Sequence, residues 1–158
     1  YGINFFKNSV TEFYSIRPFY VFGFGQEKNS LINQLFKASI TNQNINLSSC
    51  NVFRDYVYVY NVVYAFLNII NSNFKNPGIY NVGSGKSIKL KTFVKKIWSR
   101  LNKDNKMLKF DRLENQKEQV QLKSFSNNNK IKKYYNWKMK YKLDDGINHM
   151  IKEFNLNK

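Results

Sequence analysis

Apolar residues recur at helical spacing in four stretches of the chain. Each stretch places apolar side chains three or four positions apart, which lines one face of an α-helix. The four predicted helices cover residues 29–40, 60–72, 88–101 and 144–154. The residues expected at their N-termini are Asn29 or Ser30, Asn61, Ser87, and the pair Asp144 and Asp145. Ser and Asn side chains cap helix N-termini, and carboxylates are stabilised by the positive end of the helix dipole.

Runs rich in aromatic and β-branched residues alternate with these helices and predict short strands. Residues 13–23 are read as a buried strand that continues into a loop. Two short strands around a turn are expected within 44–59, one at 79–82, one or two within 102–126, and a short helix at 127–135. Strands that alternate with helices indicate an α/β fold. The length of 158 residues fits a single unit covering residues 1–158.

The chain contains one cysteine, Cys50, and one histidine, His149. These counts exclude an internal disulfide and a Cys/His metal cluster, so no metal site is expected. We expect Cys50 to be a small buried or turn residue, and His149 to lie on one face of the last helix without a catalytic role. No apolar run reaches the ~20 residues that cross a bilayer, and no signal peptide is visible. We therefore expect no membrane partner and a cytoplasmic protein.

The formal net charge of +16 raises binding to nucleic acid or to another anionic surface as a hypothesis. Lysines spread along the chain account for nearly all of the excess, and asparagine is just as abundant, a pairing typical of AT-rich genomes. Only four arginines occur, although the arginine fork matches phosphates and guanine edges. We expect a diffuse positive charge and no dedicated nucleic-acid partner.

The segment GIYNVGSGKSIKL, residues 78–90, invites comparison with the phosphate-binding P-loop. That loop requires G-x-x-x-x-G-K-[ST]. Counting back from Gly85 places Tyr80 where the first glycine must stand, so the spacing excludes a P-loop. The dinucleotide fingerprint G-x-G-x-x-G is also incomplete, because Lys28 occupies the third glycine position of GFGQEK.

Four segments, in order along the chain, resemble motifs of extended short-chain dehydrogenases. IRPFYVFGFGQ (16–26) resembles L-R-x-F-N-V-Y-G-P-G-Q, and RDYVYVYNVVYAF (54–66) resembles R-D-[FY]-[IV]-[YH]-V-x-D-[VL]-x-x-A. GIYNVGSGKSIKL resembles G-x-[VY]-N-[IV]-G-[ST]-G, and NNNKIKKYYNWKMKYKLDDGI (127–147) resembles D-x-S-K-x-x-x-x-L-G-W-x-P-x-x-[ST]-L-E-E-G-[IL]. From about residue 15 to the end, the chain is thus similar to the NAD-dependent epimerase/dehydratase family, whose members act on nucleotide sugars.

The resemblance implies the C-terminal, substrate-binding part of an extended Rossmann-type fold, without the N-terminal dinucleotide-binding βαβ units. It implies NAD or NADP as cofactor, held mainly by that missing part, a nucleoside-diphosphate sugar as substrate, and a homodimer as the assembly of the whole enzyme. The whole enzyme would move a hydride to the nicotinamide and then epimerise, dehydrate or reduce the sugar. The family's catalytic Y-x-x-x-K pair is not matched, because Phe5 stands where lysine would follow Tyr1. We therefore expect no catalytic residue in this chain, and no activity from it alone.

The resemblance also assigns residues to the nucleotide. Arg54 matches an arginine that contacts the pyrophosphate, and its planar fork suits that role. The alternative is an Arg54–Asp55 surface pair, which would contribute little. Arg112 matches a second contact to the phosphate or ribose, so we expect Arg54 and Arg112 to converge on one cleft. Asn115 stands where the family has an acid that binds ribose hydroxyls.

Other matched positions concern the sugar and the nicotinamide. Tyr56 is expected beside Arg54 as a wall or a hydrogen-bond donor. Tyr20 replaces an asparagine that faces the sugar, and Phe19 matches a residue near the nicotinamide, although both could be plain strand residues. The NVGSG turn either lies against the nucleotide sugar or is a plain strand–helix turn.

Two interpretations outside the enzyme class stay open. One is a basic module that binds phosphates or RNA, and the other is a degenerate, non-catalytic family member. A G-x-x-G-x-x-G turn and a Y-x-x-x-K pair upstream of this sequence would decide for the enzyme.

Overall fold

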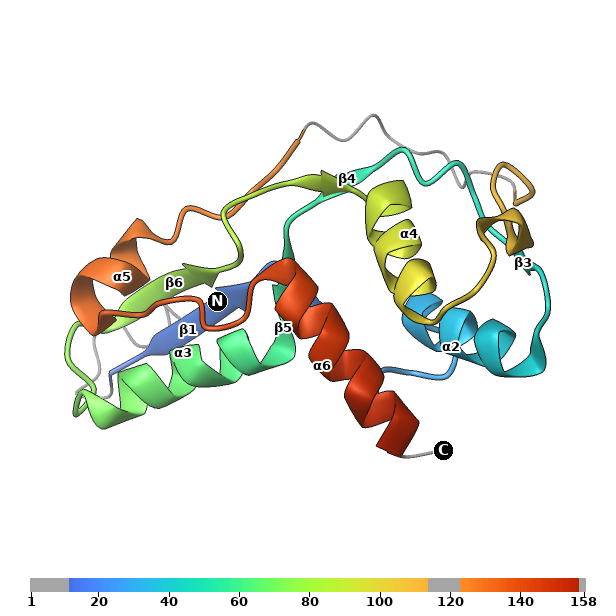
Figure 1. Ribbon diagram of the computed structural model, residues 1–158. Helices are drawn as coiled ribbons and strands as arrows, with labels where there is room; N and C mark the ends of the chain where they lie inside the picture. Colours follow the sequence, from blue (N-terminus) through green and yellow to red (C-terminus); the bar gives the residue numbers. More distant parts are fainter. Residues whose placement is uncertain (1–11, 114–122, 157–158) are drawn as a thin grey trace.

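The computed structural model describes residues 12–113 and 123–156 and has a mixed α/β fold, as expected (Figure 1). Its helices are α2 (Leu31–Thr41), α3 (Val59–Asn71), α4 (Leu90–Arg100), α5 (Asn129–Tyr135), α6 (Leu143–Leu156) and the 3-10 helix η1 (Asn105–Met107). Its strands are β1 (Tyr14–Pro18), β2 (Tyr20–Phe22), β3 (Ile45–Asn46), β4 (Phe53–Arg54), β5 (Tyr56–Tyr58), β6 (Gly78–Val82), β7 (Ile88–Lys89) and β8 (Leu108–Lys109).

The strands pair two by two, and most pairs are parallel. β1 pairs with β6, β2 with β5 and β3 with β8 in parallel, whereas β4 and β7 are antiparallel. A parallel pair needs a crossover connection between its strands. The helix α3 follows β5 directly and leads to β6, and it packs against β1 and β2.

Two hydrophobic clusters lie on opposite faces of β5. Tyr56 and Tyr58 belong to the larger cluster, with apolar residues of α2, α4 and α6. Val57 belongs to the smaller cluster, with residues of α3, β6 and α5. Successive side chains of a strand point to opposite faces, so these three residues join the two halves seen in Figure 1.

The five predicted helices agree with the observed ones to within two residues at every end. Ser30 caps α2 as predicted, since its Oγ accepts from the Asn33 N–H at 3.3 Å. Asp144 and Asp145 lie in the first turn of α6. The predicted helix 29–40 is α2, 60–72 is α3, 88–101 is α4, 127–135 is α5 and 144–154 is α6.

Two predicted caps are wrong. Asn61 lies inside α3, which begins after Tyr58; the side chain of Asn61 is buried and bonds the backbone of residues 140 and 141 instead. Ser87 does not start α4, because the next two residues pair with β4 before the helix begins at Leu90. At Asn61 tertiary hydrogen bonds replace the local cap, whereas at Ser87 strand pairing moves the start of the helix to Leu90.

The predicted strand 13–23 is two strands separated at Phe19, which pair with different partners. The first of them, β1, is half-buried to exposed rather than buried. Cys50 is buried in a left-handed conformation (φ 53°), consistent with the small turn residue expected there. None of the helices in the described ranges is both long enough and apolar enough to cross a membrane.

Candidate functional site

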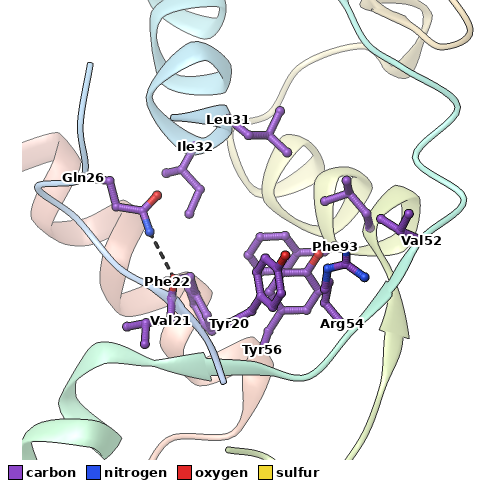
Figure 2. Close-up of a pocket in the computed structure, with 11 residues that line it drawn as sticks. Tyr20, Val21, Phe22, Gln26, Leu31, Ile32, Val52, Arg54, Tyr56 and Phe93 are labelled. Atoms are coloured by element: carbon purple, nitrogen blue, oxygen red, sulfur yellow. Dashed lines mark hydrogen bonds between the residues drawn. The ribbon is translucent and has the colours of Figure 1, made fainter. Parts of the chain in front are cut away.

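Three of the predicted site residues, Tyr20, Arg54 and Tyr56, line one pocket of about 250 Å³. Figure 2 shows their side chains converging beneath α2 and α4. The remaining walls are mostly hydrocarbon and come from residues 21, 22, 26, 31, 32, 52, 90 and 93. The site is therefore an apolar pocket with one charged group, Arg54.

The register of neighbouring strands brings these residues together. Tyr20 stands opposite Tyr56 in the parallel pair of β2 and β5, and their rings meet edge to face at 6.0 Å. The Tyr20 N–H donates to the Asp55 carbonyl at 2.9 Å, which fixes the start of β2 beside the Arg54–Tyr56 segment.

The Arg54 guanidinium is held by a carbonyl and a ring rather than by a carboxylate. Its Nη1 donates to the Phe53 carbonyl at 2.9 Å, and its Cζ lies 4.8 Å from the centre of the Tyr20 ring. Within residues 12–113 and 123–156 no carboxylate pairs with Arg54. The alternative Arg54–Asp55 surface pair is thus not formed, and the other guanidinium N–H groups remain for an anion.

Asp55 has a structural role that the sequence did not reveal. It is 1% exposed, and its carboxylate accepts from Ser84 N and Oγ at 2.7 and 2.6 Å, from Gly85 N at 3.1 Å and from Ser126 N at 2.8 Å. A buried carboxylate is tolerated when several donors satisfy it. Asp55 thereby ties the glycine turn to the strand segment that carries Arg54.

The glycine turn directs its N–H groups into the protein. Gly83 N donates to the Asn128 side chain at 3.2 Å, while Ser84 and Gly85 donate to Asp55. A Cβ on Gly83 would lie 2.5 Å from Ser126 Oγ, so only glycine fits there. These contacts favour the plain strand–helix turn over a backbone cradle for phosphate.

Tyr56 forms an aromatic wall of the pocket. It is buried, and its ring stacks on Phe93 of α4 at 4.0 Å with an interplanar angle of 8°. Burial raises the pKa of Tyr56, while nearby Arg54 partly opposes the rise. The phenol therefore stays protonated at neutral pH and can donate a hydrogen bond.

The other predicted site residues lie elsewhere. Phe19 separates β1 from β2, its N–H donates to the Val82 carbonyl at 2.9 Å, and it does not line this pocket. Arg112 is exposed, and its backbone N–H donates to the Leu47 carbonyl at 3.0 Å. Arg112 is not a lining residue either, so its convergence with Arg54 stays a prediction. Asn115 lies outside the described residues.

The sequence interpretation missed the walls supplied by α2 and α4. Leu31 and Ile32 of α2 and Leu90 and Phe93 of α4 line the pocket. Their helical spacing was visible, but periodicity alone does not tell which residue faces a pocket and which faces the core. Gln26 was also missed; its Nε2 donates to the Val21 carbonyl at 3.2 Å, as Figure 2 shows.

The described residues do not form a dinucleotide cradle. In such a cradle glycines let the pyrophosphate approach a helix N-terminus. Here a Cβ on Gly23 would meet Val59 at 2.7 Å, so this glycine serves packing of the protein itself. The next helix, α2, begins only at Leu31.

Comparison with known proteins places these features in a family. The sequence profile described as the NAD dependent epimerase/dehydratase family matches residues 3–83. A CDP-abequose synthase from Salmonella muenchen is 35% identical over 81 residues, which are 50% of this chain and 27% of that protein.

Solved structures share the fold over nearly the whole chain. The dTDP-glucose 4,6-dehydratase of Bacillus anthracis, in complex with NAD, matches with a TM-score of 0.83 at 17% identity, covering 98% of this chain and 48% of its own. A UDP-glucose 4-epimerase of Thermotoga maritima with UDP-glucose matches with a TM-score of 0.78 at 20% identity, covering 98% and 49%. The chain thus spans about half the length of these structures. Because the family's profile matches half of its sequence, the chain belongs to the NAD dependent epimerase/dehydratase family.

Proposed function

We propose that this chain forms the nucleotide-sugar-binding part of an NAD- or NADP-dependent epimerase, dehydratase or reductase. Arg54 carries the proposal. It is the one charged group in an apolar pocket, and it faces no carboxylate in the described part of the chain. A guanidinium in such surroundings suits a diphosphate, which it can hold through two charge-assisted hydrogen bonds.

The aromatic walls complete this assignment. Tyr20 lies under the guanidinium, where its ring restrains the arginine fork, and it would face the sugar. Tyr56 would supply a neutral hydroxyl at the same wall. We assign Arg112 and Asn115 to the far end of the nucleotide and Phe19 to the nicotinamide side, as the family motifs imply.

The nicotinamide cofactor would be held mainly by residues outside those described. Relatives support its use, since their structures were determined with NAD and with NADPH. When bound, the cofactor would accept and return the hydride. The contribution of this chain would be to bind the substrate diphosphate and to orient the sugar. A homodimer and a cytoplasmic location are part of the same proposal.

Calorimetric titration of the protein tests the proposal. CDP-, dTDP- and UDP-glucose should be tried separately, because the relatives are named for CDP, dTDP and UDP compounds. We expect at least one to bind with a single site per chain, and inorganic pyrophosphate to compete. If a folded sample bound none of them but bound RNA with a steep salt dependence, the basic-module interpretation would replace this proposal.

A further inference from the structure

A second cluster of polar side chains lies away from the pocket, between the start of α3 and the face of α6. Tyr58 Oη is 2.8 Å from His149 Nδ1 and 3.1 Å from Glu153 Oε2. Tyr60 Oη donates to Glu153 Oε1 at 2.9 Å, and His149 Nδ1 lies 3.6 Å from Glu153 Oε2. None of these four residues lines the Arg54 pocket. Two phenols, an imidazole and a carboxylate thus meet at one place.

The fold brings the four groups together from three directions. His149 and Glu153 are four residues apart on α6, so they share one face of that helix. Tyr58 ends β5, and Tyr60 is the second residue of α3. Close approach of α6 depends on Gly146, where a Cβ would lie 2.8 Å from the Tyr58 ring. Figure 1 shows the start of α6 beside the junction of β5 and α3.

We propose that Tyr58, Tyr60, His149 and Glu153 bind a hard, Lewis-acidic metal ion, with ferric iron as the best match. The first reason is the spacing of the donors. In tetrahedral and octahedral sites with bonds of about 2.0–2.1 Å, adjacent donor atoms lie about 2.8–3.4 Å apart. Three distances in this cluster, 2.8, 2.9 and 3.1 Å, fall in that range, and the fourth, 3.6 Å between His149 Nδ1 and Glu153 Oε2, is slightly longer.

The donor atoms also define a position that an ion could occupy. The distances of 2.8, 3.1 and 3.6 Å join Tyr58 Oη, His149 Nδ1 and Glu153 Oε2 into a triangle. Its circumradius is about 1.9 Å, so an ion slightly out of the plane reaches all three atoms at an ordinary bond length. Tyr60 Oη and Glu153 Oε1, which are 2.9 Å apart, would supply further donors.

The charges and donor types favour a trivalent ion. Two phenolates and one carboxylate carry three negative charges, which balance Fe³⁺, while the imidazole binds as a neutral ligand. Phenolate and carboxylate oxygens are hard ligands, and iron accepts tyrosinate and imidazole in proteins. Binding would replace the phenol protons that form hydrogen bonds in the ion-free cluster and release them to solvent.

The site can be reached from solvent. The side chains of His149 and Glu153 are 35% and 25% exposed, whereas Tyr58 is 1% exposed and anchors the cluster in the core. No sequence motif points to this cluster, because its residues lie up to 95 positions apart and two of them are tyrosines. This is why counting cysteines and histidines led to an expectation of no metal.

Titration of the protein with ferric nitrilotriacetate tests the proposal. We expect a visible phenolate-to-iron charge-transfer band that saturates at one iron per chain. The variants Tyr60→Phe and Glu153→Gln should each weaken iron binding at least about tenfold. Tyr141→Phe is the matched control, since its ring packs on Tyr58 and His149 but its hydroxyl is not one of the donors.

Folding of each variant is checked by circular dichroism. Tyr60 is only half-buried, so we expect Tyr60→Phe to fold and to keep the test valid. The absence of a charge-transfer band in the wild-type protein would overturn the proposal. A band of equal strength in Tyr60→Phe and Glu153→Gln, or one lost equally in Tyr141→Phe, would overturn it as well.

Discussion

In the whole enzyme, replacing Arg54 with alanine should weaken nucleotide-sugar binding and leave the affinity for the nicotinamide cofactor nearly unchanged. In the structure one guanidinium nitrogen donates to Phe53, the plane lies over Tyr20, and no carboxylate in the described ranges competes for the remaining N–H groups. Loss of a charge-assisted hydrogen-bonding group costs about 1.5–3 kcal/mol. This corresponds to a loss of roughly ten- to a hundredfold in affinity.

Two further variants separate the contribution of the bidentate arginine contact from the contribution of positive charge alone. Arg54→Lys keeps the positive charge but cannot form the bidentate contact, so its loss should fall between wild type and alanine. Lys152→Ala removes one charge from an exposed position of α6 and should leave binding unchanged. Calorimetry of the whole enzyme with the nucleotide sugar and with NAD, in separate titrations, measures both affinities. If Arg54→Ala weakened NAD as much as the nucleotide sugar, or weakened neither, the diphosphate role of Arg54 would be refuted.

Three predictions concern stability, each measured by urea unfolding at pH 7 unless stated. Asp55→Asn should destabilise the protein by about 2–4 kcal/mol, because an amide group would meet N–H donors in a buried site; an unchanged midpoint would contradict this role. Gly83→Ala should destabilise the protein by about 1–3 kcal/mol, because the new Cβ would lie 2.5 Å from Ser126 Oγ. A loss below about 0.5 kcal/mol, within the range of ordinary surface substitutions, would show that the turn accommodates the Cβ and would contradict this prediction. The hydrogen bond from Lys96, with Arg100 nearby, lowers the pKa of Asp144 below 3.8, so its stabilisation is present above that pH and is lost as the pH falls through the lowered value. Asp144→Asn should therefore cost only about 0.5–1 kcal/mol at pH 7, since the side chain is 49% exposed, and the difference should vanish in acid; a constant difference down to pH 2 would contradict it.

The helices were predictable because each has a regular apolar face. The apolar stripe predicted for α3 includes Val62 and Ile69, which are buried, but also four side chains that are 42–51% exposed, namely Val63, Phe66, Leu67 and Ile70. Periodicity therefore located the helix but did not fix which of its faces is buried. Helix ends were less predictable where a distant segment competes for the same backbone. Asn61 illustrates this, because its side chain binds residues 140 and 141 rather than the helix end. No local pattern reveals a partner about eighty residues away.

The site was predictable only in part, for a similar reason. Motif resemblance pointed to Tyr20, Arg54 and Tyr56, and strand register brings them to one pocket. Asp55 was considered only as a partner of Arg54, whereas its carboxylate points away to the glycine turn. Side chains of neighbouring residues along a strand face opposite sides, so Arg54 and Asp55 were poorly placed to pair. This alternation could have been read from the sequence. The apolar walls from α2 and α4 depend on tertiary packing, which sequence spacing does not specify.

The side-chain NMR signal of Arg54 tests the central claim most directly. The Nε–Hε resonance of Arg54 should be followed while a nucleotide sugar identified by calorimetry is added, with Arg17 and Arg100 as internal references. Arg17 is exposed on β1, and Arg100 already pairs with Asp144. We predict a saturating shift of the Arg54 signal, with slowed exchange of its Hε proton, at the same ligand concentration that saturates calorimetric binding. Saturation of the protein with no change at Arg54 would show that the nucleotide sugar binds elsewhere.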